Sequence, residues 1–215
     1  VDKNGCYLRL TEFRGGMEVQ RQKALEAINN HECGFYYEQN AKQYSKIPGS
    51  PVAYWVSEAF IRAYNSKKIG NYGIARSGLQ TGNNDLFLKY WHEVSIETIA
   101  FGMNSKEEYL ESRKKWIPQI KGGEFRKWYG NFDYVVNWKN DGRDIKECKS
   151  CRLNAMTTDQ FYFKKGITWS HTTSSVFGAR YLPTGYFFNV EAPTLFLEND
   201  ILYFLGFLDS CVAQL

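Results

Sequence analysis

The sequence has no apolar run of the roughly 18 residues that a membrane-spanning helix requires, and no signal peptide opens it. Cysteine is scarce, with five residues in a chain of 215. An odd number of cysteines without a secretory signal is typical of reduced thiols. We therefore expect a cytoplasmic protein that does not enter a membrane. Because the chain starts at Val1 and stops at Leu215 inside an apolar helical pattern, we also expect it to be part of a longer protein.

Common catalytic and cofactor motifs are also missing. The chain contains no GxGxxG turn, no P-loop and no GxSxG nucleophile motif. Its three histidines, His31, His92 and His171, do not lie in a pattern with metal-ligand spacing. The sequence therefore predicts no catalytic residue, no bound cofactor and no metal site in this chain.

Acidic residues are absent from residues 160–190, although the whole chain has 23 of them. The same stretch carries the cations Lys164, Lys165 and Arg180, together with His171. It also holds a run of hydroxyl side chains: Thr168, Ser170, Thr172, Thr173, Ser174 and Ser175. Phosphates take charge from Lys and Arg, and hydrogen bonds from hydroxyl and backbone N–H groups. This composition favours binding to a polyanion, although a basic, hydroxyl-rich β-segment would have the same composition.

Two further stretches are basic. Residues 59–84 lack acidic residues and end in the loop GLQTGNN, and residues 112–132 contain one acidic residue, Glu124. Their cations are Arg62, Lys67, Lys68, Arg76, Arg113, Lys114, Lys115, Lys121, Arg126 and Lys127. A single charge run is usually a solvated face, and the net charge of +4 indicates little. Three such stretches that share one face would favour binding to a nucleic acid.

The loop GLQTGNN has a composition suited to base edges. Gln80, Thr81, Asn83 and Asn84 carry the amide and hydroxyl groups that pair with bases, and Arg76 precedes them. An ordinary polar loop that caps a helix has the same composition. Both interpretations stay open at this point.

A metal-dependent nuclease is one alternative. Glu147 and Lys149 form an E-x-K pair, with Asp133 or Asp141 upstream. Two carboxylates and a lysine can hold Mg²⁺ and activate water. A charged turn has the same composition, because residues 139–149 are dense in both signs of charge.

A zinc site is a second alternative. Cys148 and Cys151 form a lone CxxC pair, which His31 and Cys33 could in principle complete. The second pair lacks the usual spacing of zinc ligands, so we do not expect a metal there.

The order of predicted elements indicates an α+β fold with a mostly β core, flanking helices and a helical segment at each end. Helices are expected at residues 16–30, 51–64, 85–91, 105–116 and 201–215. Strands are expected at residues 132–138, 160–165, 167–173, 177–182, 186–190 and 193–197, and a strand that enters a glycine-rich loop at residues 69–80. We expect residues 1–50 to form a helical spacer and residues 51–215 to form the main domain.

Four long blocks of the chain resemble a known family. They are IPGSPVAYWVSEAF, ARSGLQTGNNDLFLKYWHEV, KGGEFRKWYGNFDYVVNW and GITWSHTTSSVFGARYLPTGYFFNVEAPTLF. In this order they resemble the C-terminal half of the BREX phage-defence adenine-specific DNA methyltransferases (PglX) and of related fused restriction–modification enzymes. The resemblance runs from about Tyr7 to the end of the chain.

The resemblance implies that this chain is a target recognition domain. In that family the N-terminal half methylates adenine at N6 with S-adenosylmethionine, through an Asn/Asp-Pro-Pro-aromatic loop that this chain lacks. The implied partners are double-stranded DNA, the methyltransferase domain of the same chain and other phage-defence proteins. A magnesium-dependent nuclease and a basic protein-interaction module remain the alternatives.

The residues that we predict to contact DNA follow from the basic stretches and from the resemblance. They are Arg76, Gln80, Thr81, Asn83, Asn84, Lys121, Arg126, Lys127, Lys164, Lys165, Ser170, His171, Thr172, Thr173, Ser174, Ser175 and Arg180. Trp55, Trp91, Trp128 and Trp138 are expected to pack in the core rather than to stack on bases.

Overall fold

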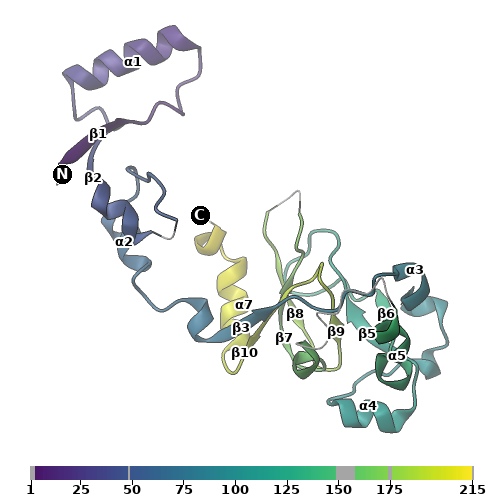
Figure 1. Cartoon of the computed structure of the whole chain (residues 1–215). Helices are drawn as coiled ribbons and strands as arrows, with labels where there is room; N and C mark the ends of the chain where they lie inside the picture. The colour runs from purple at the N-terminus through teal and green to yellow at the C-terminus, as the bar shows by residue number, and fades with distance from the viewer. Residues whose placement is uncertain (1–2, 48, 149–157, 174–175, 215) are drawn as a thin grey trace. The chain divides into compact units, whose positions relative to one another are not determined.

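The computed structural model describes residues 3–47, 49–148, 158–173 and 176–214 (Figure 1). The chain divides into two compact units, Val1–Lys68 and Ile69–Leu215. The fold is α+β with a β-rich core, as the sequence predicts. Among the described residues, no helix is long and apolar enough to cross a membrane.

The first unit is a two-stranded antiparallel sheet with short helices. Its elements are β1 (Asn4–Leu8), α1 (Met17–Asn29), β2 (Tyr36–Asn40), the 3-10 helix η1 (Ala41–Lys46) and α2 (Glu58–Ala63). Helix α1 was predicted at residues 16–30, and Ala27 is its one buried residue. A helix this polar is stabilised by few packing contacts, so the unit has a small core.

Helix α2 is shorter than the predicted helix at residues 51–64. It begins at Glu58 because the Ser57 hydroxyl accepts a hydrogen bond from the Phe60 amide at 3.2 Å and caps the first turn. Ser50, the predicted cap, has a left-handed φ of 47°. Pro51 therefore belongs to a loop before the helix. The observed cap is Ser57, so the predicted start of the helix at residue 51 was too early.

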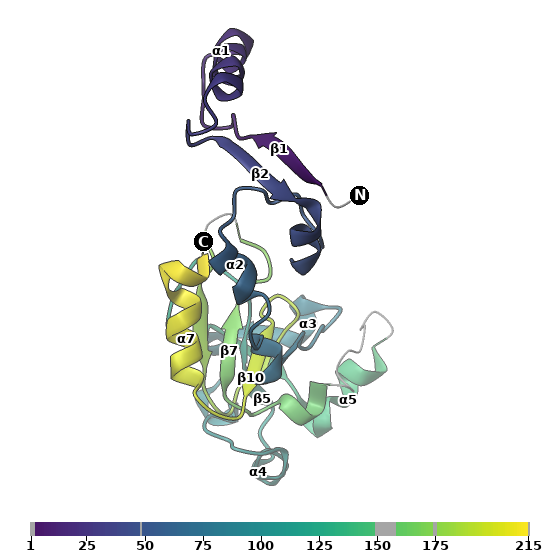
Figure 2. The same cartoon turned by 90° about the vertical axis from the view of Figure 1, so that its left-hand side faces the viewer.

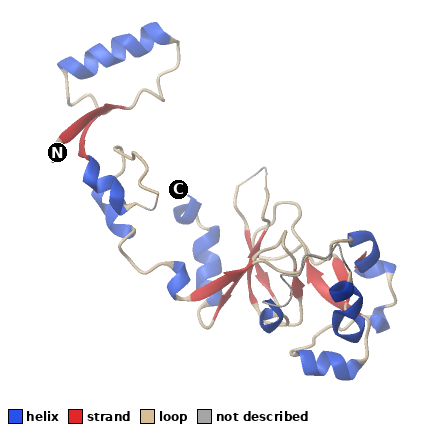
Figure 3. Cartoon of the chain, viewed as in Figure 1, coloured by secondary structure: helices blue, strands red, loops and turns tan. Residues whose placement is uncertain are grey.

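The second unit contains two four-stranded sheets (Figure 3). The first is wholly antiparallel, in the order β3 (Gly73–Arg76), β10 (Thr194–Leu197), β7 (Gly166–Trp169), β8 (Ala179–Leu182). The second has the order β4 (Leu88–Tyr90), β6 (Tyr134–Asn137), β5 (Trp116–Ile120), β9 (Phe187–Phe188), and its β5–β9 pair is parallel.

Helices cover these sheets. Helix α7 (Ile201–Asp209) lies beside β7 (Figure 2), and its buried Ile201 and Leu205 pack with Ile167 and Leu195. The helices α3 (Asn84–Phe87), α4 (Lys106–Ser112) and α5 (Lys139–Glu147) lie on the side of the second sheet (Figure 1). Strands β5 and β10 are buried at every position, so both faces of each sheet are covered at its centre.

Some local predictions differ from the structure. The helix predicted at residues 85–91 ends at Phe87, and the chain continues as strand β4. Residues 160–165, predicted as a strand, form the 3-10 turn η5 (Asp159–Phe161), followed by Phe163 with a φ of 66°. This chain reversal directs two consecutive aromatic residues, Tyr162 and Phe163, into the core, which an exposed strand edge would not allow. The turn predicted at residues 139–143 is present: Asn140, Asp141 and Gly142 have left-handed dihedral angles and interrupt the first part of α5.

The core of the second unit is aromatic. Tyr162 stacks on Phe187 with ring centroids 3.9 Å apart, and Trp138 meets the same ring edge-on at 5.0 Å. Trp138 is 2% exposed, as predicted. The prediction was wrong for the other three tryptophans: Trp55, Trp91 and Trp128 are 44%, 46% and 53% exposed.

Candidate nucleic-acid interface

Predicted DNA-contacting stretches that are far apart in the sequence meet at residues 189–191, which connect β9 to β10. On one side, Leu79 pairs with Asn189 in an isolated bridge. On the other side, the amide of His171 donates to the carbonyl of Glu191 at 2.9 Å. One short segment therefore holds the loop of residues 80–84 and the start of the hydroxyl-rich stretch.

Two glycines make this meeting possible. A Cβ on Gly78 would lie 2.0 Å from the carbonyl oxygen of Phe188, and a Cβ on Gly122 would lie 2.3 Å from that of Glu191. Only glycine can approach another backbone this closely. Gly78 therefore approaches strand β9 of the chain itself. We call the result the junction surface, and it comprises residues 80–84, 119–126, 170–173 and 189–191.

Some side chains of the loop of residues 80–84 stabilise the loop itself, and others face pockets. The Asn83 side chain accepts from the Leu86 amide at 3.2 Å and caps α3. Thr81, which is 4% exposed, donates to the Asn84 carboxamide oxygen at 2.5 Å. Gln80 is half-buried beside them. The capping interpretation is therefore correct for Asn83, while Gln80 and Asn84 face pockets.

Lys121 lies between the loop and Glu191. Its ammonium is 3.5 Å from the Glu191 carboxylate and 5.3 Å from the centre of the Tyr134 ring. The Tyr134 hydroxyl donates to that of Tyr90 at 3.1 Å, and this hydrogen bond, with burial, raises the pKa of Tyr134 to about 12. The phenol therefore stays protonated at neutral pH, and Lys121 is held by one carboxylate and one aromatic ring.

The stretch of residues 122–132 meets the outer edge of β8 at Trp128, which pairs with Arg180. The Ser170 hydroxyl donates to the Gly123 carbonyl at 3.1 Å and accepts from its amide at 3.3 Å. Arg126 is exposed, whereas the Lys127 ammonium donates to the Asp209 carbonyl at 2.8 Å. Lys127 therefore sits at the C-terminus of α7, where a cation stabilises the helix. Arg126 remains the exposed cation of this stretch.

The hydroxyl-rich stretch continues the junction surface. His171, Thr172 and Thr173 are exposed, and the His171 Nδ1 lies 3.4 Å from the Thr172 hydroxyl oxygen. Ser174 and Ser175 lie outside the described residues. The described part of the stretch therefore presents an imidazole and hydroxyl groups to solvent.

Arg180 lies inside the molecule rather than on the surface. Its side chain is 1% exposed, and two of its nitrogens donate to the Ser170 hydroxyl, both at 3.3 Å. Burial lowers the pKa of Arg180, and the opposite charge of Asp209 counteracts part of that effect. Asp209 is itself 5% exposed and accepts from the Ala179 amide at 2.8 Å. In this structure Arg180 supports the junction surface from behind.

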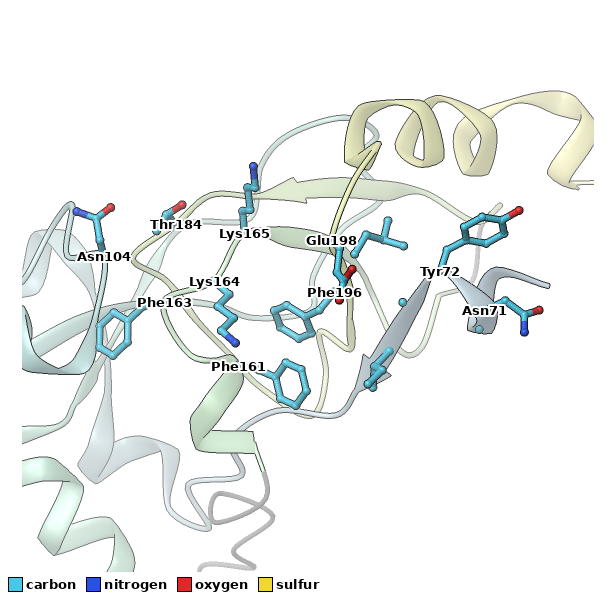
Figure 4. Close-up of a pocket in the computed structure, with 14 residues that line it drawn as sticks. Asn71, Tyr72, Asn104, Phe161, Phe163, Lys164, Lys165, Thr184, Phe196 and Glu198 are labelled. Atoms are coloured by element: carbon cyan, nitrogen blue, oxygen red, sulfur yellow. The ribbon is translucent and has the colours of Figure 1, made fainter. Parts of the chain in front are cut away.

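Three other predicted cations gather at a different place, which we call the Phe161 pocket (Figure 4). The cavity has a volume of about 770 Å³, and Lys164 and Lys165 line it with Phe161 and Phe196. The Lys164 ammonium and the Arg76 guanidinium lie 5.6 Å and 5.5 Å from the centre of the Phe161 ring. In Figure 4 the Lys164 amine is directed toward the two phenylalanine rings, and Lys165 is directed away from them.

The residues of the nuclease alternative do not form a cluster in the described structure. Glu147 is exposed at the end of α5, Asp133 is exposed, and Lys149 lies outside the described residues. The Asp141 carboxylate accepts hydrogen bonds from two lysine side chains, at 2.8 Å and 3.0 Å. In the part of the chain that the structure describes, no three His, Cys, Asp or Glu side chains could hold one metal ion.

The zinc alternative falls partly outside the described residues, which include Cys148 but not Cys151. His31 stacks on the Tyr36 ring, with centroids 4.0 Å apart. The His31 imidazole therefore packs face to face on an aromatic ring of the first unit. Cys33 is half-buried.

The sequence analysis missed several polar residues of the junction surface. Gln119, Asn189 and Glu191 were not predicted, although all three line one pocket with Gln80. A signal for Gln119 was present, because it is the one aliphatic polar side chain in the buried strand WIPQI. A lone polar residue in a fully buried strand indicates a specific partner.

No protein-family model matches the chain. It is 39% identical over 214 residues to "Adenine-specific methyltransferase PglX" of Lacticaseibacillus casei (strain Zhang), a match that covers 96% of this chain and 18% of that protein. It is 37% identical over 190 residues to "Adenine-specific methyltransferase BrxX" of Escherichia coli O9:H4 (strain HS), covering 87% of this chain and 14% of that protein. The chain thus spans less than a fifth of the length of these curated relatives. The predicted resemblance is confirmed: the chain is homologous to one segment of the adenine-specific methyltransferases PglX and BrxX.

Proposed function

We propose that this chain recognises the DNA target of an adenine-specific N6-methyltransferase of a phage-defence or restriction–modification system. The similarity to PglX and BrxX supports the link to adenine methylation. The observation that carries the proposal is the junction surface, where three basic or polar stretches meet at residues 189–191. Amide, hydroxyl and cationic groups on one surface match the donors and acceptors that DNA presents.

The two regions are suited to different parts of a DNA duplex. On the junction surface, hydrogen bonds hold Asn83, Asn84 and Ser170 in place beside Gln80, which favours reading of base edges. The Phe161 pocket offers the exposed cations Lys164 and Lys165, which favours contact with phosphates of any sequence. In this proposal the first region supplies specificity and the second supplies affinity.

Methyl transfer is assigned to another part of the protein. A nucleotide-type cofactor site is built on a parallel sheet with a glycine-rich turn before a helix. Among the described strands, the one parallel strand pair is β5–β9, and no such turn follows either strand. The described residues therefore do not fit an S-adenosylmethionine site, and we derive no step of methyl transfer from them.

The test uses the full-length protein with Gln80→Ala or Arg76→Ala, and sequencing that detects methylated adenine across a genome. We expect Gln80→Ala to relax the methylated motif at one position, because a side chain that no longer reaches its base gives up about 1–3 kcal/mol of discrimination. We expect Arg76→Ala to reduce methylation of an unchanged motif evenly, because a phosphate contact carries no sequence information.

The control is Gln20→Ala, which changes an exposed glutamine on α1 of the first unit. Its methylation pattern should equal that of the wild-type protein. Complete methylation of an unchanged motif in both Gln80→Ala and Arg76→Ala would contradict the proposed function for these residues.

A further inference from the structure

A second pocket, with a volume of about 220 Å³, is present on the junction surface. Its lining comes from three stretches that are far apart in the sequence. The side chains in it that can form hydrogen bonds are those of Gln80, Thr81, Asn84, Gln119, Asn189 and Glu191. Thr81 donates to Asn84, Asn189 accepts from the Glu191 amide, and Glu191 pairs with Lys121.

Gln119 is the most unusual of these residues. It lies on β5, where its backbone pairs with both β6 and β9, and it is 1% exposed. Neither the nitrogen nor the oxygen of its carboxamide has a hydrogen-bond partner among the described residues. Each such buried group left unpaired costs about 1–3 kcal/mol. A native protein keeps this cost only when something else, such as water or a ligand, supplies the partner.

The charges of the pocket indicate which ligand fits. Among the residues that line it, the one with a charged side chain is Glu191, whose side chain is 52% exposed. No lysine or arginine lines it, but the Lys121 ammonium beside it lies 3.5 Å from the Glu191 carboxylate. The two opposite charges offset each other, so the pocket offers no net positive charge to hold a phosphate. A neutral ligand with N–H donors and adjacent acceptors does suit it.

We infer that this pocket receives the amino-bearing edge of an adenine or a cytosine, and that Gln119 binds that edge. This inference rests on the proposed function. A carboxamide pairs with the N6 amine and N7 of adenine, and a carboxylate such as that of Glu191 accepts from the N4 amine of cytosine. Because the Gln119 side chain is 1% exposed, a stacked base in a duplex cannot reach it. The base enters unstacked, and the side chains at the mouth of the pocket move aside to admit it.

The experiment combines a change in the protein with a change in the base. Duplexes that the full-length wild-type protein prefers are selected from a random library. At each adenine of the selected site, purine replaces the base, and at each cytosine, 2-pyrimidinone replaces it, so that the amino group alone is removed. Binding of wild-type protein and Gln119→Leu to all duplexes is then measured.

We expect Gln119→Leu to bind the selected duplex about 5- to 100-fold more weakly than the wild type, which corresponds to the loss of one bidentate base pairing. On the duplex without the amino group at the bound position, the two proteins should bind alike. The position at which this happens shows whether the base is adenine or cytosine. If the protein change and the base change weaken binding independently at every position, the inference is overturned, and water remains as the partner of Gln119.

Two controls keep the result clear. Gln20→Leu makes the same substitution at an exposed site of the first unit and should bind as the wild type does. Gln119→Leu removes an unpaired buried amide, so it should unfold at the wild-type temperature or above. If it nevertheless fails to fold, Glu191→Gln replaces it in the same comparison, with the same two outcomes. If the wild-type protein selects no sequence at all, the proposed function itself fails. If the wild-type protein selects a site and Gln119→Leu binds that site with the same affinity, the inference alone is overturned.

Discussion

The junction surface and the Phe161 pocket hold their cations in different ways. On the junction surface, Lys121 pairs with Glu191, and the buried Arg180 donates to Ser170. At the Phe161 pocket, Arg76 and Lys164 lie over an aromatic ring. Fixed polar groups lose little freedom when they meet a base, whereas mobile cations follow a phosphate backbone of any sequence. A basic sequence therefore does not by itself indicate which part of a nucleic acid is bound.

The largest effect should come from the point that joins the two sheets. Gly78→Ala would place a Cβ 2.0 Å from the Phe188 carbonyl oxygen, so the backbone must move. We expect a loss of about 3 kcal/mol in the free energy of unfolding, because backbone cannot yield as a flexible side chain does. The measurement is urea denaturation followed by circular dichroism.

The matched control is Gly206→Ala in α7, where an added Cβ meets no atom within 4 Å. This change should stabilise the protein by about 0.5–1 kcal/mol, because alanine favours a helix over glycine. Equal stability of the two variants would show that the junction surface does not depend on the close approach of Gly78.

A smaller effect should come from the support behind the junction surface. Asp209→Ala removes the acceptor of the Ala179 amide and the charge near Arg180. We expect a loss of about 2 kcal/mol in the free energy of unfolding, since a buried donor is left unpaired. The control Asp144→Ala, at an exposed position of α5, should stay within about 0.5 kcal/mol of the wild type. A wild-type denaturation curve for Asp209→Ala would mean that the support lies elsewhere.

The sequence predicted the fold class and most of the short strands, because alternating apolar residues and glycine or proline breaks mark strands well. Strands β7, β8, β9 and β10 all fall within predicted ranges, apart from the first residue of β7. It could not predict the reversal at Phe163, since a left-handed φ of 66° in an aromatic residue comes from packing of the core rather than from local preference.

The candidate site was harder to predict than the fold. Composition identified stretches of cations, but burial separates Arg180 from Arg126, and tertiary contacts assign Lys127 to the end of α7. Gln119 lies in the basic stretch of residues 112–132 but was not among the predicted contacts, and Glu191 lies outside the basic stretches. Only the folded chain places the two together. Charge patterns in a sequence therefore indicate a surface, while the polar groups that would discriminate bases depend on long-range contacts.

The Phe161 pocket can be tested by neutralising its two exposed lysines. Lys164→Gln with Lys165→Gln should weaken binding of the full-length protein to any duplex. The slope of log affinity against log salt should fall by about 0.9 for each phosphate that the protein no longer neutralises. The control is Lys115→Gln with Lys139→Gln, an equal charge change at exposed positions outside both regions. Equal slopes for the two double variants would mean that net charge, rather than this pocket, drives binding.

The smallest effect concerns Asp141, which belongs to neither region and so provides a baseline for both. Burial opposes the ionised form of Asp141, but hydrogen bonds and charges from Lys106 and Lys146 outweigh it and lower the pKa of Asp141. A folded-state pKa below the unfolded value contributes stability that is present above about pH 4 and is lost as pH falls through the folded-state pKa. Asp141→Asn keeps the left-handed φ of 59°, which asparagine tolerates well, and removes the titration.

We therefore expect the variant to lose less stability than the wild type between about pH 5 and pH 2, with DNA binding at neutral pH unchanged. The measurement is thermal unfolding across that range. Parallel pH curves for the two proteins would contradict a lowered pKa, and altered DNA binding would show that the α4–α5 side contributes to one of the two regions.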